Sequence, residues 1–140
     1  MHQLELSQDF NAPVSRLFAA WTRPDLMRTW FAPGDLAVLE ADVDFRVGGR
    51  YRLVMQEPGG ERHVVGGEYL EIAQDEKLAF SWKFETSPHT TRVALDFTPL
   101  GEAQSRLQLV HTEFVDEASC EHHKQGWLGC LAKLGLKGLN

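Results

Sequence analysis

The chain has 140 residues, 43% of them hydrophobic and 24% charged, and a formal net charge of −6. These values are typical of one globular domain, to which we assign residues 1–140. The acidic balance, without any basic run, argues against nucleic-acid binding and binding to anionic membranes. No apolar run approaches the roughly 18 residues that a membrane-spanning helix needs, so we expect no membrane insertion.

The first part of the sequence predicts one strand followed by two short helices. Apolar and polar residues alternate between residues 4 and 10, which indicates a half-buried strand. Apolar residues then recur at helical spacing within residues 14–21 and again within residues 26–30. Pro24 separates these two helices, and Pro33-Gly34 is expected to end the second one.

From Val38 onward the apolar period changes to two, which predicts six further strands. They are expected at residues 38–46, 50–56, 64–72, 77–85, 91–98 and 106–114. Their short connections favour an antiparallel meander. On the first of these strands the residues expected to face inward are Leu39, Ala41, Val43 and Phe45. The turn after it is predicted as a three-residue loop that pairs Phe45 with Tyr51 and closes with a glycine at positive φ.

One amphipathic helix, at about residues 117–136, is predicted to end the fold. Its apolar face carries residues at spacings of three and four, namely Cys120, His123, Trp127, Cys130, Leu131 and Leu134. Such a face must cover something, and the inner face of the sheet is the available surface. The fold class is therefore α+β, with a seven-stranded antiparallel sheet packed on a long C-terminal helix.

A curved sheet closed by a single helix favours a ligand cavity over a fully packed core, which is the alternative. Aromatic residues at inward positions support this interpretation, because small-ligand pockets are mostly apolar with a few polar groups. The walls that we predict are Trp30, Phe80, Trp82, Phe97, Leu109, His111, His123 and Trp127. Trp30 and Phe31 either gate the mouth of this cavity or cap the core.

Two histidines are predicted to meet across the cavity, His111 from the last strand and His123 from the helix. By parity Glu113 also faces inward beside His111, and a histidine beside a carboxylate suits acid–base chemistry. No nucleophile elbow or oxyanion motif accompanies them, so we predict that His111 is a hydrogen-bonded structural residue. We assign no catalytic residue. An enzyme that uses His111 or Glu113 is the alternative.

The spacing of the two cysteines predicts that their thiols are reduced and bind no metal ion. Cys120 and Cys130 lie ten positions apart, about 15 Å along the axis, so they can neither bridge each other nor share one metal ion with His123. Free thiols fit a reducing compartment, and residues 1–5 do not resemble a signal peptide, so we expect a cytoplasmic protein. No phosphate-binding glycine motif is present, and no cofactor is expected.

Several segments resemble a known family over nearly the whole chain. They are FNAPVSRLF (10–18), WTRP (21–24), WFAPG (30–34), DFRVGGRY (44–51), GEYLEI (67–72), HTEF (111–114) and GW (126–127). Together they resemble the SRPBCC proteins, the START-like or birch-pollen-allergen-like superfamily. Within it they are most similar to homologues of the activator of the heat-shock-protein-ninety ATPase. One departure is residues 102–105, which replace the usual Gly-Thr before the last strand.

The resemblance implies the helix-grip fold, in which a curved antiparallel sheet wraps a long C-terminal helix around a hydrophobic cavity. Members of the superfamily bind lipids, polyketides, hormones or aromatic compounds, and some are enzymes. We therefore expect a binding module for a small lipophilic or aromatic molecule. A small-molecule enzyme and a co-chaperone-like interaction module, with a chaperone as its partner, are the alternatives.

Overall fold

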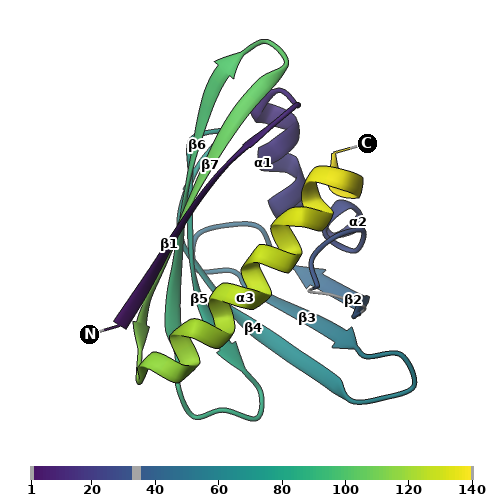
Figure 1. Ribbon diagram of the computed structural model, residues 1–140, viewed down its shortest axis with the longest axis vertical. Coiled ribbons are helices and arrows are strands. Elements are labelled where there is room, and N and C mark those ends of the chain that lie inside the picture. Colours follow the sequence, from purple (N-terminus) through teal and green to yellow (C-terminus); the bar gives the residue numbers. More distant parts are fainter. Residues whose placement is uncertain (1, 33–35, 140) are drawn as a thin grey trace.

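A seven-stranded antiparallel sheet curves around a long C-terminal helix (Figure 1). The computed structural model describes residues 2–32 and 36–139, so Pro33-Gly34, the predicted end of the second helix, lies outside the described residues. The strands are β1 (His2–Phe10), β2 (Ala37–Val43), β3 (Arg50–Gln56), β4 (Arg62–Ala73), β5 (Lys77–Phe84), β6 (Thr91–Gly101) and β7 (Gln104–Phe114). Their order in the sheet is β1-β7-β6-β5-β4-β3-β2, which confirms the predicted meander and the α+β class.

Two short helices follow β1, as predicted: α1 (Val14–Thr22) and α2 (Pro24–Met27). The apolar residues of α1 fall on one face, where Leu17, Phe18 and Trp21 are almost fully buried. Helix α1 packs against β6 and β7, and both helices lie at the end of the molecule where the chain terminates (Figure 1).

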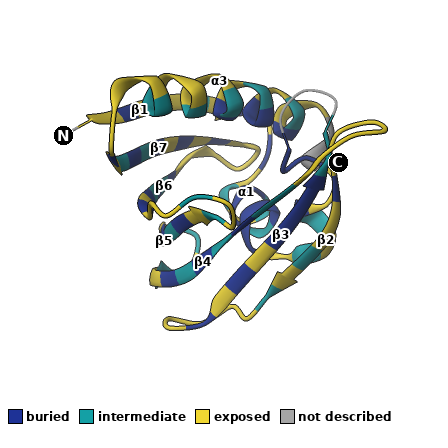
Figure 2. Ribbon diagram, turned by 90° about the horizontal axis from the view of Figure 1, so that it is seen from below, coloured by how far each residue is buried: buried dark blue, intermediate teal, exposed yellow. Residues whose placement is uncertain are grey.

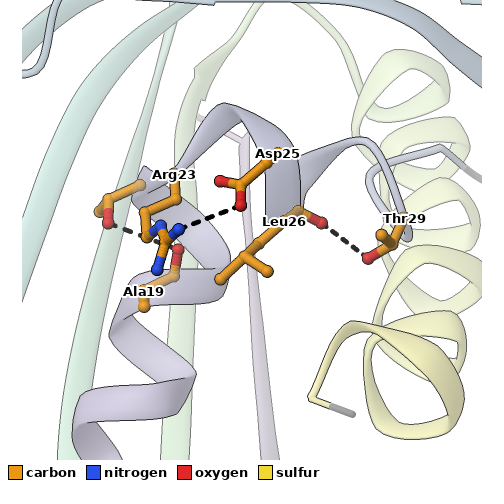
Figure 3. Close-up of polar contacts among 6 residues, drawn as sticks. Ala19, Arg23, Asp25, Leu26 and Thr29 are labelled. Carbon is orange, nitrogen blue, oxygen red and sulfur yellow. Dashed lines mark hydrogen bonds and ion pairs between the residues drawn. The ribbon is translucent and has the colours of Figure 1, made fainter.

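Polar contacts fix the corner between α1 and α2 (Figure 3). The backbone N–H of Arg23 donates to the Ala19 carbonyl at 3.0 Å, which completes the last turn of α1. The Arg23 guanidinium contacts the Asp25 carboxylate at 3.0 Å, and the Thr29 hydroxyl donates to the Leu26 carbonyl at 2.7 Å. Both ionic partners are exposed, so this pair contributes little free energy and the backbone bond defines the corner.

The C-terminal helix α3 (Glu117–Lys133) continues into one π-helical turn, η1 (Leu134–Gly138). Asp116 caps its start by accepting a hydrogen bond from the Ser119 backbone N–H at 2.7 Å. Figure 2 shows α3 along the open side of the curved sheet. The predicted stripe is confirmed: Trp127, Cys130, Leu131 and Leu134 are buried, and Cys120 and His123 are half-buried. None of the described helices is both long and apolar enough to cross a membrane.

A β-bulge in β2 corrects the predicted inner face of that strand. Register shifts between Val38 and Glu40, so Val38 points inward and Leu39, which we expected inside, is 37% exposed. The predicted three-residue turn is also wrong, because Tyr51 pairs with Val43 and not with Phe45.

The longer turn, residues 44–49, folds against β4. Gly48 donates to the Tyr69 carbonyl at 2.9 Å, and Tyr69 donates to the Gly49 carbonyl at 2.9 Å. Gly48 has a φ of +86°, so the predicted glycine at positive φ is confirmed. The Phe45 ring lies 5.2 Å from the Tyr69 ring, and Phe45 therefore belongs to this docked turn and not to the sheet.

A second irregularity, near the end of β7, overturns the inward placement of Glu113. His111 pairs with Leu4 and Phe114 pairs with His2, so β7 contains one more residue than β1 over this stretch. Glu113 accommodates the extra residue by adopting a φ of +72°, and its side chain is exposed. Phe114 takes the inner position instead. No carboxylate from β7 therefore faces inward beside His111.

Candidate functional site

A groove of about 320 Å³ opens between α3 and strands β3, β4 and β5. The described residues of its lining combine aromatic and aliphatic side chains with three histidines and one carboxylate. The residues are Phe31, Leu36, Met55, Glu57, His63, Trp82, Phe84, His122, His123, Gly126, Trp127 and Cys130. This composition, mostly apolar with a few polar groups, is typical of sites for small organic ligands.

Aromatic rings from three parts of the chain form one wall of the groove. Trp82 and Phe84 reach it from β5, where two-residue alternation points both side chains inward. The Trp82 and Trp127 ring centroids are 5.1 Å apart, and Phe31 lies 5.8 Å from Trp127 and 6.2 Å from Trp82. The rings pack on one another, so the wall is fixed before any ligand arrives.

Behind this wall, His111 anchors Trp127 through a buried chain of hydrogen bonds. The Trp127 Nε1–H donates to His111 Nδ1 at 3.0 Å, so the proton of the neutral ring lies on Nε2. His111 Nε2 is 2.6 Å from the Thr91 hydroxyl, to which it donates, and that hydroxyl donates to the Trp82 carbonyl at 3.2 Å. Every donor and acceptor in this series of hydrogen bonds has a partner only if the His111 ring is neutral.

Burial, with a smaller contribution from the nearby His123, lowers the pKa of His111 from 6.5 to about 3. Both ring nitrogens are already engaged, so the ring has no free position from which to move a proton to or from a ligand. His111 therefore acts as a structural support for the aromatic wall. This agrees with its predicted hydrogen-bonded role.

His123 lies closer to the groove and keeps one nitrogen available. Its Nδ1 donates to the Ser119 carbonyl at 2.8 Å, which leaves Nε2 as an acceptor in the neutral ring. Burial lowers the pKa of His123 and so favours that neutral form. The His111 and His123 ring centroids lie 5.2 Å apart, so the two histidines meet as the sequence suggested.

The structure distributes the predicted wall residues between the groove and the core. Trp82, His123 and Trp127 line the groove, and His111 lies directly behind it. The remaining four are buried in the core away from the lining, namely Trp30, Phe80, Phe97 and Leu109. Trp30 donates to the Ala20 carbonyl at 3.0 Å and is 1% exposed, so it caps the core and does not gate the mouth.

Sequence reasoning missed several lining residues. Phe84 was on the inward face of its strand, and Gly126 lies three positions after His123, so periodicity could have identified both. Glu57 and His63 come from the end of the β3–β4 hairpin, which reaches α3 only in three dimensions. Their positions left no periodic signal in the sequence.

The arrangement suits binding better than nucleophilic or metal chemistry. Burial raises the pKa of the Cys130 thiol to about 12, which keeps it protonated and unreactive. Within residues 2–32 and 36–139, no three His, Cys, Asp or Glu side chains are grouped closely enough to hold a metal ion. The described part of the groove therefore offers an aromatic wall, a carboxylate and three histidines, of which His123 has Nε2 as an acceptor.

A curved sheet, a long helix across its open side and a groove between them define a protein of the helix-grip class. The chain belongs to the family described as Activator of Hsp90 ATPase homolog 1-like proteins, whose model matches residues 11–135. This confirms the SRPBCC, START-like assignment made from the sequence motifs. No curated protein matches the sequence.

Solved structures support the same assignment. The chain is 27% identical to the AHSA1 protein of Silicibacter pomeroyi, with a TM-score of 0.87 and coverage of 96% of each chain. It is 25% identical to an HSP90 activator from Plasmodium falciparum, with a TM-score of 0.75 and coverage of 97% of this chain and 95% of that one. CalU16 of Micromonospora echinospora is also 25% identical, with a TM-score of 0.75 and coverage of 99% of this chain and 76% of that one.

Proposed function

We propose that this protein binds a small, largely apolar aromatic molecule in the groove between α3 and the sheet. The observation that carries the proposal is the preformed aromatic wall, in which His111 fixes the Trp127 ring from behind. The groove volume of about 320 Å³ is at the small end of ligand pockets. It suits a ligand of roughly one or two fused rings. Two free thiols, Cys120 and Cys130, support a cytoplasmic setting.

The enzyme alternative has lost part of its support. Glu113, its proposed carboxylate, is exposed, and both nitrogens of His111 are occupied within the protein. Binding needs neither group to exchange a proton, and it uses the wall as it stands. We therefore retain binding as the function that these contacts favour.

Gly126 offers a test that separates binding from folding. A Cβ built at Gly126 meets no atom within 4 Å, and this position lines the groove on α3. The substitution Gly126→Leu should therefore fill the groove and also improve helix propensity. Ala132→Leu is the matched control, because Ala132 lies on an exposed position of the same helix.

The probe is 2-naphthalenemethanol, and binding is followed by calorimetry and tryptophan fluorescence. Wild type and Ala132→Leu should bind it alike, and Gly126→Leu should bind it at least about tenfold more weakly, since the added side chain occupies the same space. Thermal unfolding shows that each variant is folded. Equal binding by Gly126→Leu, or no binding by wild type, would overturn the proposal.

A co-chaperone-like role is the second candidate, supported by the family and by the similarity to the Plasmodium HSP90 activator. The outer face of the sheet offers a charged hollow for it, lined by Asp42, Arg50, Arg52, Lys83 and Glu85 among others. If this face contacts a chaperone, Arg52→Glu should abolish stimulation of Hsp90 ATPase activity while Gly126→Leu leaves it intact. The reverse result would assign the activity to the groove.

A further inference from the structure

The groove carries a carboxylate at its rim and no Lys or Arg side chain among its described lining residues. Among the described lining residues Glu57 is the one carboxylate, and half of its side-chain surface is exposed. His63 Nε2 lies 3.3 Å from Glu57 Oε1 and holds the carboxylate in place. The Lys133 ammonium comes near the groove but donates to the Leu36 backbone carbonyl at 2.9 Å, and its side chain is not part of the lining.

The other ligand-facing groups also favour positive charge or hydrogen-bond donors. His123 presents Nε2 as an acceptor, because its Nδ1–H is held by the Ser119 carbonyl. The rings of Trp82, Phe84 and Trp127 line the groove, and the negative quadrupole of an aromatic face attracts cations. A tryptophan ring is the strongest attractor of this type, and two of them lie side by side here.

We infer that the ligand of this groove is an organic cation, an amine or quaternary ammonium group attached to an apolar body. This inference rests on the proposed binding function and names the class of ligand. The cation lies between the aromatic wall and the Glu57 carboxylate, and the apolar body lies along Met55, Phe31 and Cys130.

The same groups disfavour a fatty acid or another carboxylate. An anion in the groove would lose its hydration without gaining a Lys or Arg partner from the described lining residues, and it would lie close to Glu57. The expected order of affinity is therefore cation, then neutral molecule of the same shape, then anion.

Three naphthalene compounds of similar shape test this order: naphthalen-2-ylmethyl(trimethyl)ammonium, its neutral isostere 2-neopentylnaphthalene, and 2-naphthylacetate. Binding is measured at pH 8.5, where ordinary histidine side chains are neutral. The cation should bind wild type at least about fivefold more tightly than the neutral isostere, the range that cation–π contacts provide. The acetate should bind most weakly.

Glu57→Gln isolates the carboxylate, because an amide still accepts a hydrogen bond from His63. It should weaken binding of the cation by about threefold and leave the neutral isostere unchanged, as expected for a half-exposed charge. Glu71→Gln, which removes an exposed charge on β4 outside the lining of the groove, is the control and should change the affinity for neither compound.

If the neutral isostere or the acetate binds wild type as tightly as the cation, the inference is wrong while the binding function stands. If Gly126→Leu blocks none of the compounds, or if none of them binds, the proposed function fails and the inference fails with it. An unchanged cation affinity in Glu57→Gln would also contradict the assigned role of the carboxylate.

Discussion

Acidification should destabilise this protein through His111 more strongly than through an ordinary histidine. The folded protein holds the ring neutral, with a pKa of about 3, whereas the unfolded chain has the ordinary value of 6.5. Because the folded-state pKa is the lower one, the stabilisation is complete above pH 6.5 and is lost as the pH falls from 6.5 towards 3. Each pH unit in that window costs about 1.4 kcal/mol.

Between pH 7 and pH 5 the expected loss from His111 is about 2 kcal/mol, since most of that interval lies below the pKa of the unfolded chain. The residue is fully buried, so solvent does not screen the effect. Urea unfolding followed by tryptophan fluorescence measures it at the two pH values. The comparison protein is His111→Gln, whose amide offers a donor and an acceptor but does not titrate.

Wild type should lose about 2 kcal/mol more than His111→Gln over this pH interval. Contributions from His123 and the carboxylates occur in both proteins and largely cancel. An equal loss in the two proteins would show that His111 is not the source of this acid sensitivity. NMR of the wild-type histidine rings gives an independent check: a His111 ring that titrates near pH 6.5 would show that the ring is not held neutral.

Urea unfolding tests four further substitutions, two of them at residues that line the groove. Trp127→Phe should lower stability by about 1–3 kcal/mol, because it leaves the Nδ1 acceptor of the buried histidine unsatisfied. Gly67→Ala should lower stability by about 2 kcal/mol or more, because the new methyl group would collide with the Ser81 carbonyl oxygen. Gly126→Ala should raise stability by about 0.5–1 kcal/mol, because the added methyl group meets no atom and alanine has the higher helix propensity. Glu113→Gly should raise it by about 1 kcal/mol, since glycine adopts positive φ without strain, and should leave binding of 2-naphthalenemethanol unchanged.

The parts of the fold that follow regular alternation were predictable from the sequence. On β5, Leu78, Phe80 and Trp82 all face inward as their spacing indicated, because this strand has no irregularity within those residues. On α3, spacings of three and four identified the buried face that contains Trp127 and Cys130. In a regular strand or helix the spacing of residues along the sequence determines which way their side chains point, and so these residues were placed correctly.

The misplaced residues lie where the backbone departs from that regularity. A bulge adds one residue to a strand without any change in composition. The sequence around Leu39 and Glu113 therefore did not indicate that these side chains would face outward. Glu113 adopts positive φ although glutamate rarely does, and a glycine there would have been an identifiable signal. Glu57 and His63 reached the groove through the path of a hairpin, which local sequence does not encode.

Chemical-shift mapping with 2-naphthalenemethanol tests ligand binding in the groove directly, because it reports where the ligand lies. In ¹⁵N spectra the indole Nε1–H signals of Trp82 and Trp127 and the backbone amide of Gly126 should shift together as the compound is added. The amide of Arg52, on the outer face of the sheet, should stay unchanged. Shifts confined to the outer face, or none at any groove residue at saturating concentration, would contradict the account.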